Sequence, residues 1–394
     1  MKRLLVTVSL LAAAAGCAHR GRPPGVPPLE PVPPAAPLPP AEPMPPSPPE
    51  RPTAEAEPAR VEVPIAVAAV GDVMLGSTFP DETGGLLPPE DGAALLQEVT
   101  PILAQADVAF GNLEGPLVDG GTSEKCARSR PGRCYAFRVP TRYARHLAGA
   151  GFDVLSLANN HVGDFGDAGR ASTRAALDAL GIRYSGAPGE VARLEVRGTR
   201  LALIAFSTSS GTNDLRDLAE AARIVEAAGQ DADVVVVSFH GGAEGADRQR
   251  VPPGKEEFLG EDRGDLRAFA HAVVDAGADL VLGHGPHVVR GMEVYRGRLV
   301  AYSLGNFATY GGFNLSGPNG LSLVLEVRLA RDGSFLGGRI HPARQERPGG
   351  PRLDPQGALI PVLRQLSQDD FGATAVRVGD DGALQPPEPA LSAR

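Results

Sequence analysis

From residue 61 onward, short apolar runs alternate with segments of helical hydrophobic spacing, and this order most restricts the possible folds. Val63–Val70 and Val234–Phe239 are continuous apolar runs, which are typical of strands buried on both faces. Asp167–Leu180 is the clearest predicted helix, because it is rich in alanine and is followed by Gly181. A strand–helix alternation of this kind favours a largely parallel core sheet.

The remaining elements are expected at the following ranges. Strands are predicted at Ala106–Phe110, Phe152–Leu157, Arg200–Phe206 and from Leu280, and helices at Ala93–Gln105, Tyr143–Ala150, Leu218–Ala228 and Leu266–Ala276. After residue 290 the pattern predicts hairpin strands at Met292–Tyr295, Leu299–Leu304, Leu321–Ala330 and Phe335–Pro342, with no long helix between them. A mixed α/β sandwich of two sheets accounts for both patterns.

The N-terminal residues have the composition of an export signal followed by a tether. A basic start, the apolar run Leu4–Ala15 and small residues before Cys17 predict a signal peptide over residues 1–17. Ala-Ala-Gly-Cys resembles a bacterial lipobox, so we expect acylation of Cys17, although an ordinary secretory signal with an incidental cysteine is the alternative. Residues 21–60 contain 17 prolines and cannot pack a core, so residues 18–60 are predicted to be a disordered, proline-rich tether.

These features predict an exported lipoprotein, anchored to a bacterial membrane and facing the periplasm or the cell exterior. The folded domain is expected at residues 61–375, with a polar flexible tail at 376–394. In an oxidising compartment Cys126 and Cys134 are expected to form a disulfide that closes a surface loop. The net charge of −9 makes nucleic acid an unlikely partner on electrostatic grounds.

Five strings of polar and small residues follow predicted strands at the points where those strands end. They are Gly71-Asp72, Asn112-Leu113-Glu114, Asn159-Asn160-His161, His240-Gly241-Gly242 and Gly283-His284-Gly285-Pro286-His287. The carboxyl ends of parallel strands form one edge of a sheet, so these residues are expected to converge there. Four of the eight histidines in the chain fall within these strings, which points to a chemical site.

Carboxylate, amide and imidazole groups together suit a divalent cation such as Mn²⁺, Zn²⁺ or Fe²⁺. Such a cation activates water and neutralises charge on a phosphate-like group, while a neighbouring histidine serves as acid or base. Structural alternatives stand beside this interpretation. Asp72 can serve as a turn carboxylate, Asn112 can form an Asx turn, Asn160 can cap a helix ahead of a core histidine, and Asp164 can cap the helix predicted from Asp167.

The strings AVGDVMLG, FGNLEGPL, SLANNHVGDFG, SFHGGAE and LGHGPHVVRGMEVYRGRLVAYSLGNF occur in this order over roughly residues 63–310. Together they resemble the bacterial capsule-synthesis protein CapA family, also called poly-γ-glutamate synthesis accessory proteins, which is similar to calcineurin-like metallophosphoesterases. The resemblance implies a four-layer α/β sandwich, with two mixed β-sheets flanked by helices. It also implies one or two divalent metal ions at the strand edge.

The same resemblance implies roles for individual residues. Asp72 matches the first-strand carboxylate, and Glu114 matches an acidic residue that can bridge two ions. The other implied metal ligands are Asn160, His240, His284 and His287. His161 matches the general acid of phosphoesterases, and Asp164 is a second catalytic candidate in the same string. Asn112, Glu244 and Asn306 are the candidate substrate-binding residues.

Two residues depart from the usual patterns. Met74 occupies the histidine position of the Asp-x-His pattern of metallophosphoesterases, as it does in CapA relatives, and a thioether is a poor ligand for a hard cation. Gly241 stands where the family commonly has tryptophan, which alters a substrate wall without touching the ligands.

Three functions are therefore compared. The first is a membrane-tethered CapA-type protein that acts on, or with, an anionic cell-surface polymer such as poly-γ-glutamate or a polysaccharide, through a metal-dependent phosphoesterase-like hydrolase site. The second is a non-catalytic scaffold of an envelope complex that exports the polymer, with polymer synthase or export proteins as partners. The third is a general periplasmic phosphodiesterase or nucleotidase.

Overall fold

The computed structural model describes residues 63–80, 85–127 and 134–388. The chain divides into two units, residues 1–59 and 60–394, and every described residue belongs to the second. The predicted signal peptide with Cys17 and the predicted tether lie outside the described residues. Among the described helices, none has the length and apolar character that crossing a bilayer requires.

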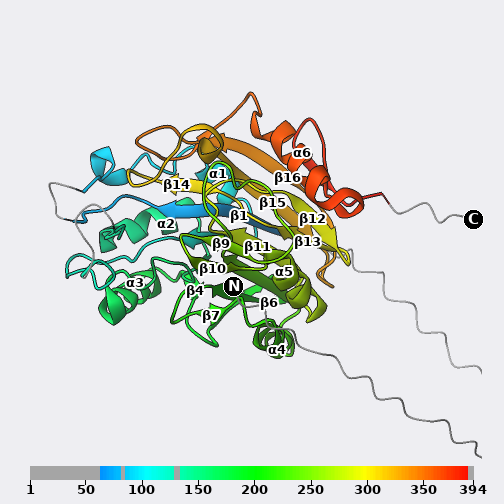
Figure 1. Cartoon of the computed structure of the whole chain (residues 1–394), viewed down its shortest axis with the longest axis horizontal. Coiled ribbons are helices and arrows are strands. Elements are labelled where there is room, and N and C mark those ends of the chain that lie inside the picture. The colour runs from blue at the N-terminus through cyan, green and yellow to red at the C-terminus, as the bar shows by residue number, and fades with distance from the viewer. Residues whose placement is uncertain (1–62, 81–84, 128–133, 389–394) are drawn as a thin grey trace, which may run out of the picture. The chain divides into compact units, whose positions relative to one another are not determined.

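The larger sheet has ten strands and combines a parallel half with an antiparallel half (Figure 1). Its order is β18-β19-β16-β15-β1-β2-β3-β4, with β14 beside β1 and β17 beside β16. Neighbours among β1 to β4 run parallel, whereas β15 and β16 are antiparallel. The strands are β1 (Ile65–Met74), β2 (Val108–Leu113), β3 (Val154–Ser156), β4 (Arg183–Ser185), β14 (Asn306–Thr309), β15 (Leu321–Leu329), β16 (Phe335–Arg344), β17 (Arg352–Leu353), β18 (Arg377–Val378) and β19 (Ala383–Gln385).

The second sheet has seven strands in the order β12-β13-β11-β8-β6-β5, with β7 beside β6. Its central strands β6, β8, β11 and β13 are parallel to their neighbours in that group. The strands are β5 (Val191–Val196), β6 (Thr199–Ser207), β7 (Asn213–Asp214), β8 (Val234–His240), β11 (Leu280–His284), β12 (Met292–Tyr295) and β13 (Arg298–Ala301). A separate hairpin of β9 (Glu256–Phe258) and β10 (Glu261–Gly264) leaves the second sheet between β8 and its next helix.

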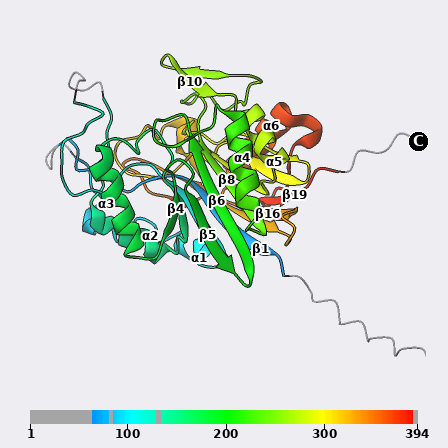
Figure 2. The same cartoon turned by 90° about the horizontal axis from the view of Figure 1, so that it is seen from below.

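The two sheets pack face to face and helices cover their outer faces, which gives the expected four layers. Figure 2 shows α2 (Ala144–Ala150) and α3 (Gly166–Asp178) on one side, and α4 (Leu218–Gly229) and α5 (Leu266–Asp275) beside β6 and β8 on the other. In β1, Val67 and Ala69 belong to the core between the sheets, whereas Ala68 and Val70 pack toward the first helices. Burial on both faces therefore explains the continuous apolar run.

The predicted helix Ala93–Gln105 is largely wrong, because only α1 (Thr100–Leu103) is α-helical. Residues before it form tighter turns, such as the hydrogen bond from the Val99 amide to the Leu96 carbonyl. Pro101 has no N–H to donate to the Gln97 carbonyl, so an α-helix cannot continue through it from the preceding residues, whereas the first turn of α1 tolerates it.

The C-terminal part of the chain is more ordered than the sequence predicts. Helix α6 (Leu359–Phe371), which the prediction lacks, buries Leu359 and Leu363 in the core between the sheets. The expectation of a flexible tail over 376–394 is wrong for residues 376–388: β18 and β19 pair with each other, and β19 pairs with β16, while 389–394 lie outside the described residues. Val378 and Leu384 are buried there, so two short strands with one apolar side chain each extend the sheet.

Candidate metal centre

The carboxyl ends of strands from both sheets meet at one place, and most of the predicted site residues lie there. Asp72 lies near the carboxyl end of β1 and pairs in parallel register with Asn112 of β2. His240 ends β8 and pairs with His284, which ends β11. The site is therefore built between two sheets, rather than along the edge of one.

Glu114, one residue beyond β2, has the most unusual environment in the site. Its side chain is fully buried, and neither carboxylate oxygen has a hydrogen-bond partner among the described residues. The Oε1 atom lies 3.6 Å from His287 Nε2 and 4.0 Å from the Nε2 atoms of His161 and His240. These separations are too long for hydrogen bonds, so the carboxylate faces three imidazole nitrogens without bonding to any of them.

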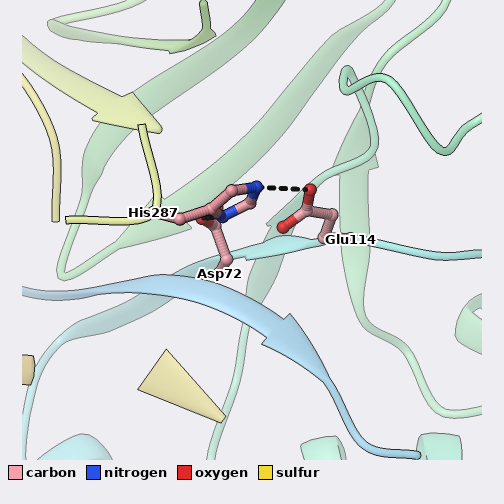
Figure 3. Close-up of side chains that lie close together, drawn as sticks. All are labelled: Asp72, Glu114 and His287. Atoms are coloured by element: carbon pink, nitrogen blue, oxygen red, sulfur yellow. Dashed lines mark hydrogen bonds and ion pairs between the residues drawn. The ribbon is translucent and has the colours of Figure 1, made fainter. Parts of the chain in front are cut away.

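Asp72 and His287 complete the cluster (Figure 3). His287 Nδ1 lies 3.0 Å from Asp72 Oδ2, and Asn112 donates from Nδ2 to Asp72 Oδ1 at 2.8 Å. One ligand atom each from Asp72, Glu114 and His287 lie within 4.8 Å of one another. Ligands bound about 2.0–2.2 Å from one ion lie roughly 3–4 Å apart, so only small side-chain movements are needed for these three to share a cation.

Burial and mutual charge shift the pKa values in this cluster. Burial raises the pKa of the Glu114 carboxyl well above its usual range, despite the opposing attraction of His287. Burial by itself lowers the pKa of His287, but the charges of Glu114 and Asp72 and the hydrogen bond to Asp72 outweigh it and raise that pKa to about 10. A cation placed here compensates the buried negative charge that the protein leaves unpaired.

His240 and His284 are driven toward their neutral forms. Burial lowers the pKa of His240 well below its usual value, and nearby Arg263 adds to the effect. Burial also lowers the pKa of His284. A neutral imidazole keeps one lone pair for a metal ion. The Nδ1 atom of His284 has no hydrogen-bond partner within the described chain, whereas His240 Nδ1 lies 3.3 Å from Asn112 Nδ2, which can only donate, so the unpartnered Nε2 atom of His240 carries the proton.

His284 is nevertheless turned partly away from the cluster. Its Nε2 atom lies 3.1 Å from the Val70 carbonyl oxygen, which can only accept, so Nε2 carries the proton. Its ligand atoms do not join the group formed by Asp72, Glu114 and His287. Direct ligation by His284 stays a prediction, with Nδ1 as the atom that has the available lone pair.

His161 is held by a buried acidic partner, as a proton-transfer group requires. Its Nδ1 atom lies 2.8 Å from Asp164 Oδ2, and its ring stacks on Phe137 at 4.2 Å between centroids. Lys125 Nζ lies 3.3 Å from Asp164 Oδ1 and donates to the Asn160 carbonyl oxygen at 3.0 Å. Burial lowers the pKa of His161, while Asp164 opposes that shift. Because a carboxylate can only accept, Asp164 fixes the proton on Nδ1 and leaves Nε2 facing Glu114.

The first asparagine of the Asn-Asn-His string, Asn159, is the one that contacts the cluster. It donates from Nδ2 to Asn112 Oδ1 at 3.2 Å and to the Leu113 carbonyl at 2.9 Å, and its Oδ1 accepts from the His161 amide. The predicted ligand Asn160 instead lines the adjoining cavity, with its Oδ1 buried and unpartnered in the described structure. Sequence reasoning missed Asn159, although the doubled asparagine was the available signal.

Two of the three candidate substrate-binding residues, Glu244 and Asn306, line a cavity of about 620 Å³ in front of the cluster. Glu244 Oε1 pairs with Arg263 Nη1 at 2.9 Å, and its Oε2 lies 3.8 Å from His287 Nε2. Asn306 also borders this cavity, whereas Asn112 is buried behind it between Asp72 and His240 Nδ1. Asn112 is therefore placed to orient cluster residues rather than to touch a substrate.

Several further residues at this site carried no sequence signal. Lys125, Phe137, Arg263 and Asn319 all line the cavity and come from loops or from the β9–β10 hairpin. Lys125 precedes Cys126, which the structure joins to Cys134 by a disulfide with 5.6 Å between Cα atoms. Their positions depend on how the loops fold over the strand ends, so no local pattern could have marked them.

Met74 is buried in the core on the helix side of the first sheet, and its sulfur accepts from the Gly76 amide at 3.3 Å. The residue at the usual histidine position therefore packs in an apolar cluster instead of offering a ligand. The donor set that remains, of carboxylates and imidazoles, fits one divalent cation of the Mn²⁺, Zn²⁺ or Fe²⁺ type.

The fold and this cluster define a class of protein. Two mixed sheets packed face to face and flanked by helices, with carboxylate, amide and imidazole groups at the strand ends, form an α/β sandwich with a candidate metal site, the arrangement that the sequence resemblance to metallophosphoesterases implies. Within that class, the chain belongs to the family of bacterial capsule synthesis proteins PGA_cap, whose family model matches residues 66–310.

Curated relatives agree with this placement. The PGA biosynthesis protein CapA of Bacillus subtilis (strain 168) is 28% identical over 288 residues, covering 68% of this chain and 69% of the relative. The capsule biosynthesis protein CapA of Bacillus anthracis is 27% identical over 264 residues, covering 62% of this chain and 59% of the relative. Among solved structures, the 5'-nucleotidase precursor from Thermus thermophilus has a TM-score of 0.37 and 12% identity, covering 71% of this chain and 54% of that chain.

Proposed function

We propose that this chain is an exported accessory protein of capsule-type polymer synthesis with a metal-dependent phosphoesterase-like hydrolase site. Membership of the capsule synthesis family supports the pathway, and two Bacillus relatives are named for PGA and capsule biosynthesis. The substrate is an anionic cell-surface polymer or its phosphorylated precursor. The reaction is hydrolysis or transfer at a phosphoester, with the cluster around Glu114 holding the ion.

The observation that carries the catalytic part is the unpartnered carboxylate of Glu114. A buried carboxylate without hydrogen bonds is strongly unfavourable, and proteins keep such groups where an ion or a reaction requires them. Three imidazole nitrogens surround it at 3.6–4.0 Å, with Asp72 beside one of them. Structural packing alone gives no reason to collect these five polar groups at the ends of strands from two sheets.

When bound, a divalent cation supplies Lewis-acid polarisation of a phosphoryl oxygen and lowers the pKa of a coordinated water. The protein's own groups supply the proton transfer. His161 presents Nε2 toward the cluster while Asp164 holds its Nδ1 proton, so Nε2 can exchange a proton with a substrate oxygen in the cavity. Lys125, half-exposed at the cavity wall, places a positive charge beside this pair and can bind an anionic part of the substrate.

The test uses the full chain, loaded with Mn²⁺, Zn²⁺ or Fe²⁺, desalted, and measured for metal content and for hydrolysis of bis(p-nitrophenyl) phosphate. We expect the wild type to retain metal and turn over. The Glu114→Gln variant should lose both. The His161→Asn variant should keep most of the metal and lose turnover by about 10²–10⁴-fold, the usual contribution of a proton-transfer group.

The matched control is His341→Asn, because His341 also pairs with a carboxylate, Glu326, but lies on β16 away from the cluster. Its metal content and turnover should equal those of the wild type. A wild-type chain that binds none of the three metals would contradict the proposal.

The second candidate is a scaffold that binds metal or polymer without turnover, and the burial of Met74 favours it. A site in which methionine replaces the histidine of the Asp-x-His pattern can hold a single ion and still fail to support two-metal chemistry. Retained metal with no hydrolysis of any phosphoester would support this candidate. Efficient turnover of free nucleotides with no effect of polymer would instead support a general periplasmic nucleotidase.

We also propose that acylated Cys17 anchors the protein to a bacterial membrane and that residues 18–60 act as the tether. The support is the signal-like sequence alone, since these residues lie outside the described structure. In a bacterial host the wild type should fractionate with membranes, and Cys17→Ala should release it as a soluble exported protein. Equal membrane association of both would contradict lipid anchoring through this residue.

A further inference from the structure

His287, which approaches both carboxylates of the cluster, has an unusual backbone. Its φ angle is +59°, in the left-handed region that residues with a Cβ atom adopt rarely. Conformations of this kind persist only where the surrounding structure holds them, and they gather at functional sites. In this conformation the imidazole contacts Asp72 through Nδ1 and faces Glu114 through Nε2.

Two buried asparagine side chains meet at the carbonyl oxygen of this strained residue. Asn306 donates from Nδ2 to the His287 oxygen at 3.2 Å, and Asn319 donates from Nδ2 to the same oxygen at 3.1 Å. Because a carbonyl oxygen can only accept, both amide nitrogens must face it, which turns both amide oxygens elsewhere. Neither Oδ1 atom has a hydrogen-bond partner among the described residues, and both side chains are buried.

This arrangement is costly for a merely structural contact. A single donor satisfies a carbonyl oxygen adequately, whereas each buried amide oxygen without a partner destabilises the fold. The fold nevertheless keeps two unpartnered amide oxygens on the side chains that hydrogen-bond to one left-handed histidine. The shared consequence is a fixed direction for the His287 imidazole.

The two asparagines come from different parts of the chain. Asn306 begins β14 and stands in register with Asp72 of β1, so it is fixed relative to the carboxylate that His287 contacts. Asn319 lies in the short 3-10 helix η3 (Gly317–Gly320), beyond the residues 66–310 that the family model matches. From the same loop, Phe313 packs edge-on against the His287 ring at 5.1 Å between centroids.

We infer that Asn306 and Asn319 are positioning residues that hold His287 in its left-handed conformation. The loop 311–320 thereby acts on the metal centre without contributing a ligand to it. The inference rests on the proposed function in one respect: it takes the His287 imidazole to be a ligand of a metal ion. The placement of the ring itself is a property of the metal-free protein and can be measured separately.

The experiment uses Asn319→Leu in the full chain. Leucine has nearly the shape of asparagine but donates nothing to the His287 oxygen, and it also removes an unpartnered buried acceptor. We therefore expect the metal-free variant to melt at the same temperature as the wild type or higher. Its affinity for Mn²⁺ or Zn²⁺, measured by isothermal titration, should fall by about 10–100-fold, as expected when a group that orients a ligand is lost.

The matched control is Asn314→Leu in the same loop, where the side chain is exposed and accepts only from the Ser316 amide. Its metal affinity should remain that of the wild type. A second measurement, independent of metal, is the ¹⁵N spectrum of the histidine rings, with the His287 signals identified by their loss in His287→Gln. These signals should shift in Asn319→Leu and stay in place in Asn314→Leu.

A folded Asn319→Leu protein with wild-type metal affinity and unmoved His287 signals would overturn the inference. A lower melting temperature with unmoved signals would also overturn it, because that result describes a structural role alone. If the His287 signals shift but the wild type binds no metal, the positioning role is supported and the proposed metal-dependent function fails.

Discussion

Replacing Glu114, whose buried carboxylate has no hydrogen-bond partner among the described residues, should have different effects on the stability of the metal-free and the metal-bound protein. Replacing it by glutamine removes a buried charge whose pKa is raised because burial outweighs the attraction of His287. A raised carboxyl pKa means that the folded state loses stability as the pH rises through that pKa. From the ordinary carboxyl pKa upward, ionisation therefore favours the unfolded chain, so we expect metal-free Glu114→Gln to be more stable than the wild type at pH 8.

The size of this effect follows from the environment of Glu114. An unsatisfied buried polar group costs about 1–3 kcal/mol, and the glutamine amide can donate to the lone pair on the facing His161 Nε2 atom. With an unfolding entropy of about 2.1 cal/mol/K per residue over the unit Arg60–Arg394, that gain raises the melting temperature by roughly 1–4 °C.

Metal should remove the stability advantage of the variant. At a free metal concentration of about 100 times the dissociation constant, binding stabilises the folded wild type by about 2.7 kcal/mol. The same unfolding entropy converts this into a rise of about 4 °C. Glu114→Gln should show no such rise, so the variant should be the more stable protein in chelator and lose that advantage in saturating metal.

The assay is thermal unfolding at pH 8 in EDTA and in a series of Mn²⁺ or Zn²⁺ concentrations. Glu326→Gln is the matched control, because Glu326 also lies beside a histidine but is about a third exposed. It should change the metal-free stability by less than about 0.5 kcal/mol and keep the full metal response. A Glu114→Gln protein that is less stable than wild type in EDTA, or that still responds to metal, would refute the reasoning.

Three other perturbations test the fold. Burial raises the pKa of Asp279 to about 6, so the contribution of this carboxyl to stability is full below about pH 4 and is lost as the pH rises through 6. Asp279→Asn lacks this loss, so its unfolding free energy, measured by urea unfolding, should rise relative to that of the wild type by roughly 2–3 kcal/mol between pH 4 and pH 7. Arg290 and Glu256 form a buried bidentate pair at 2.7 and 2.8 Å, so Arg290→Met alone should cost about 3–5 kcal/mol, and adding Glu256→Met should recover part of that loss. Reducing the Cys126–Cys134 disulfide should lower the unfolding free energy by roughly 2–3 kcal/mol, and an unchanged denaturation midpoint would contradict this.

Local patterns were sufficient to predict the central strands and most of the helices. The predicted strand Val234–Phe239 differs from the observed β8 only by the addition of His240. A continuous run of β-branched apolar residues is stable as a strand whose two faces are both buried, so the local pattern was sufficient. The same approach failed for Ala93–Gln105, where apolar spacing suggested a helix but Pro101 lacks the N–H that would continue an α-helix from the residues before it.

The candidate site divides in the same way. Asp72, Glu114, His240 and His287 could be predicted as site candidates because each lies at or near the carboxyl end of a strand, and parallel strands bring such residues to a common edge. That the edge belongs to two different sheets could not be predicted, since strand order is set by long-range pairing and not by local sequence.

By itself, the sequence therefore determined which residue types stand at the strand ends, and with them the candidate site for a divalent cation. Only the tertiary structure decided how these groups are oriented: that Asn159 rather than Asn160 contacts Asn112, that Lys125 joins the His161–Asp164 pair, and that Asn319 reaches the His287 carbonyl. The physical reason is that the position of a strand in the sequence follows from its local pattern of apolar residues. The contacts of a loop depend instead on residues that are distant in the sequence and become neighbours only when the chain folds.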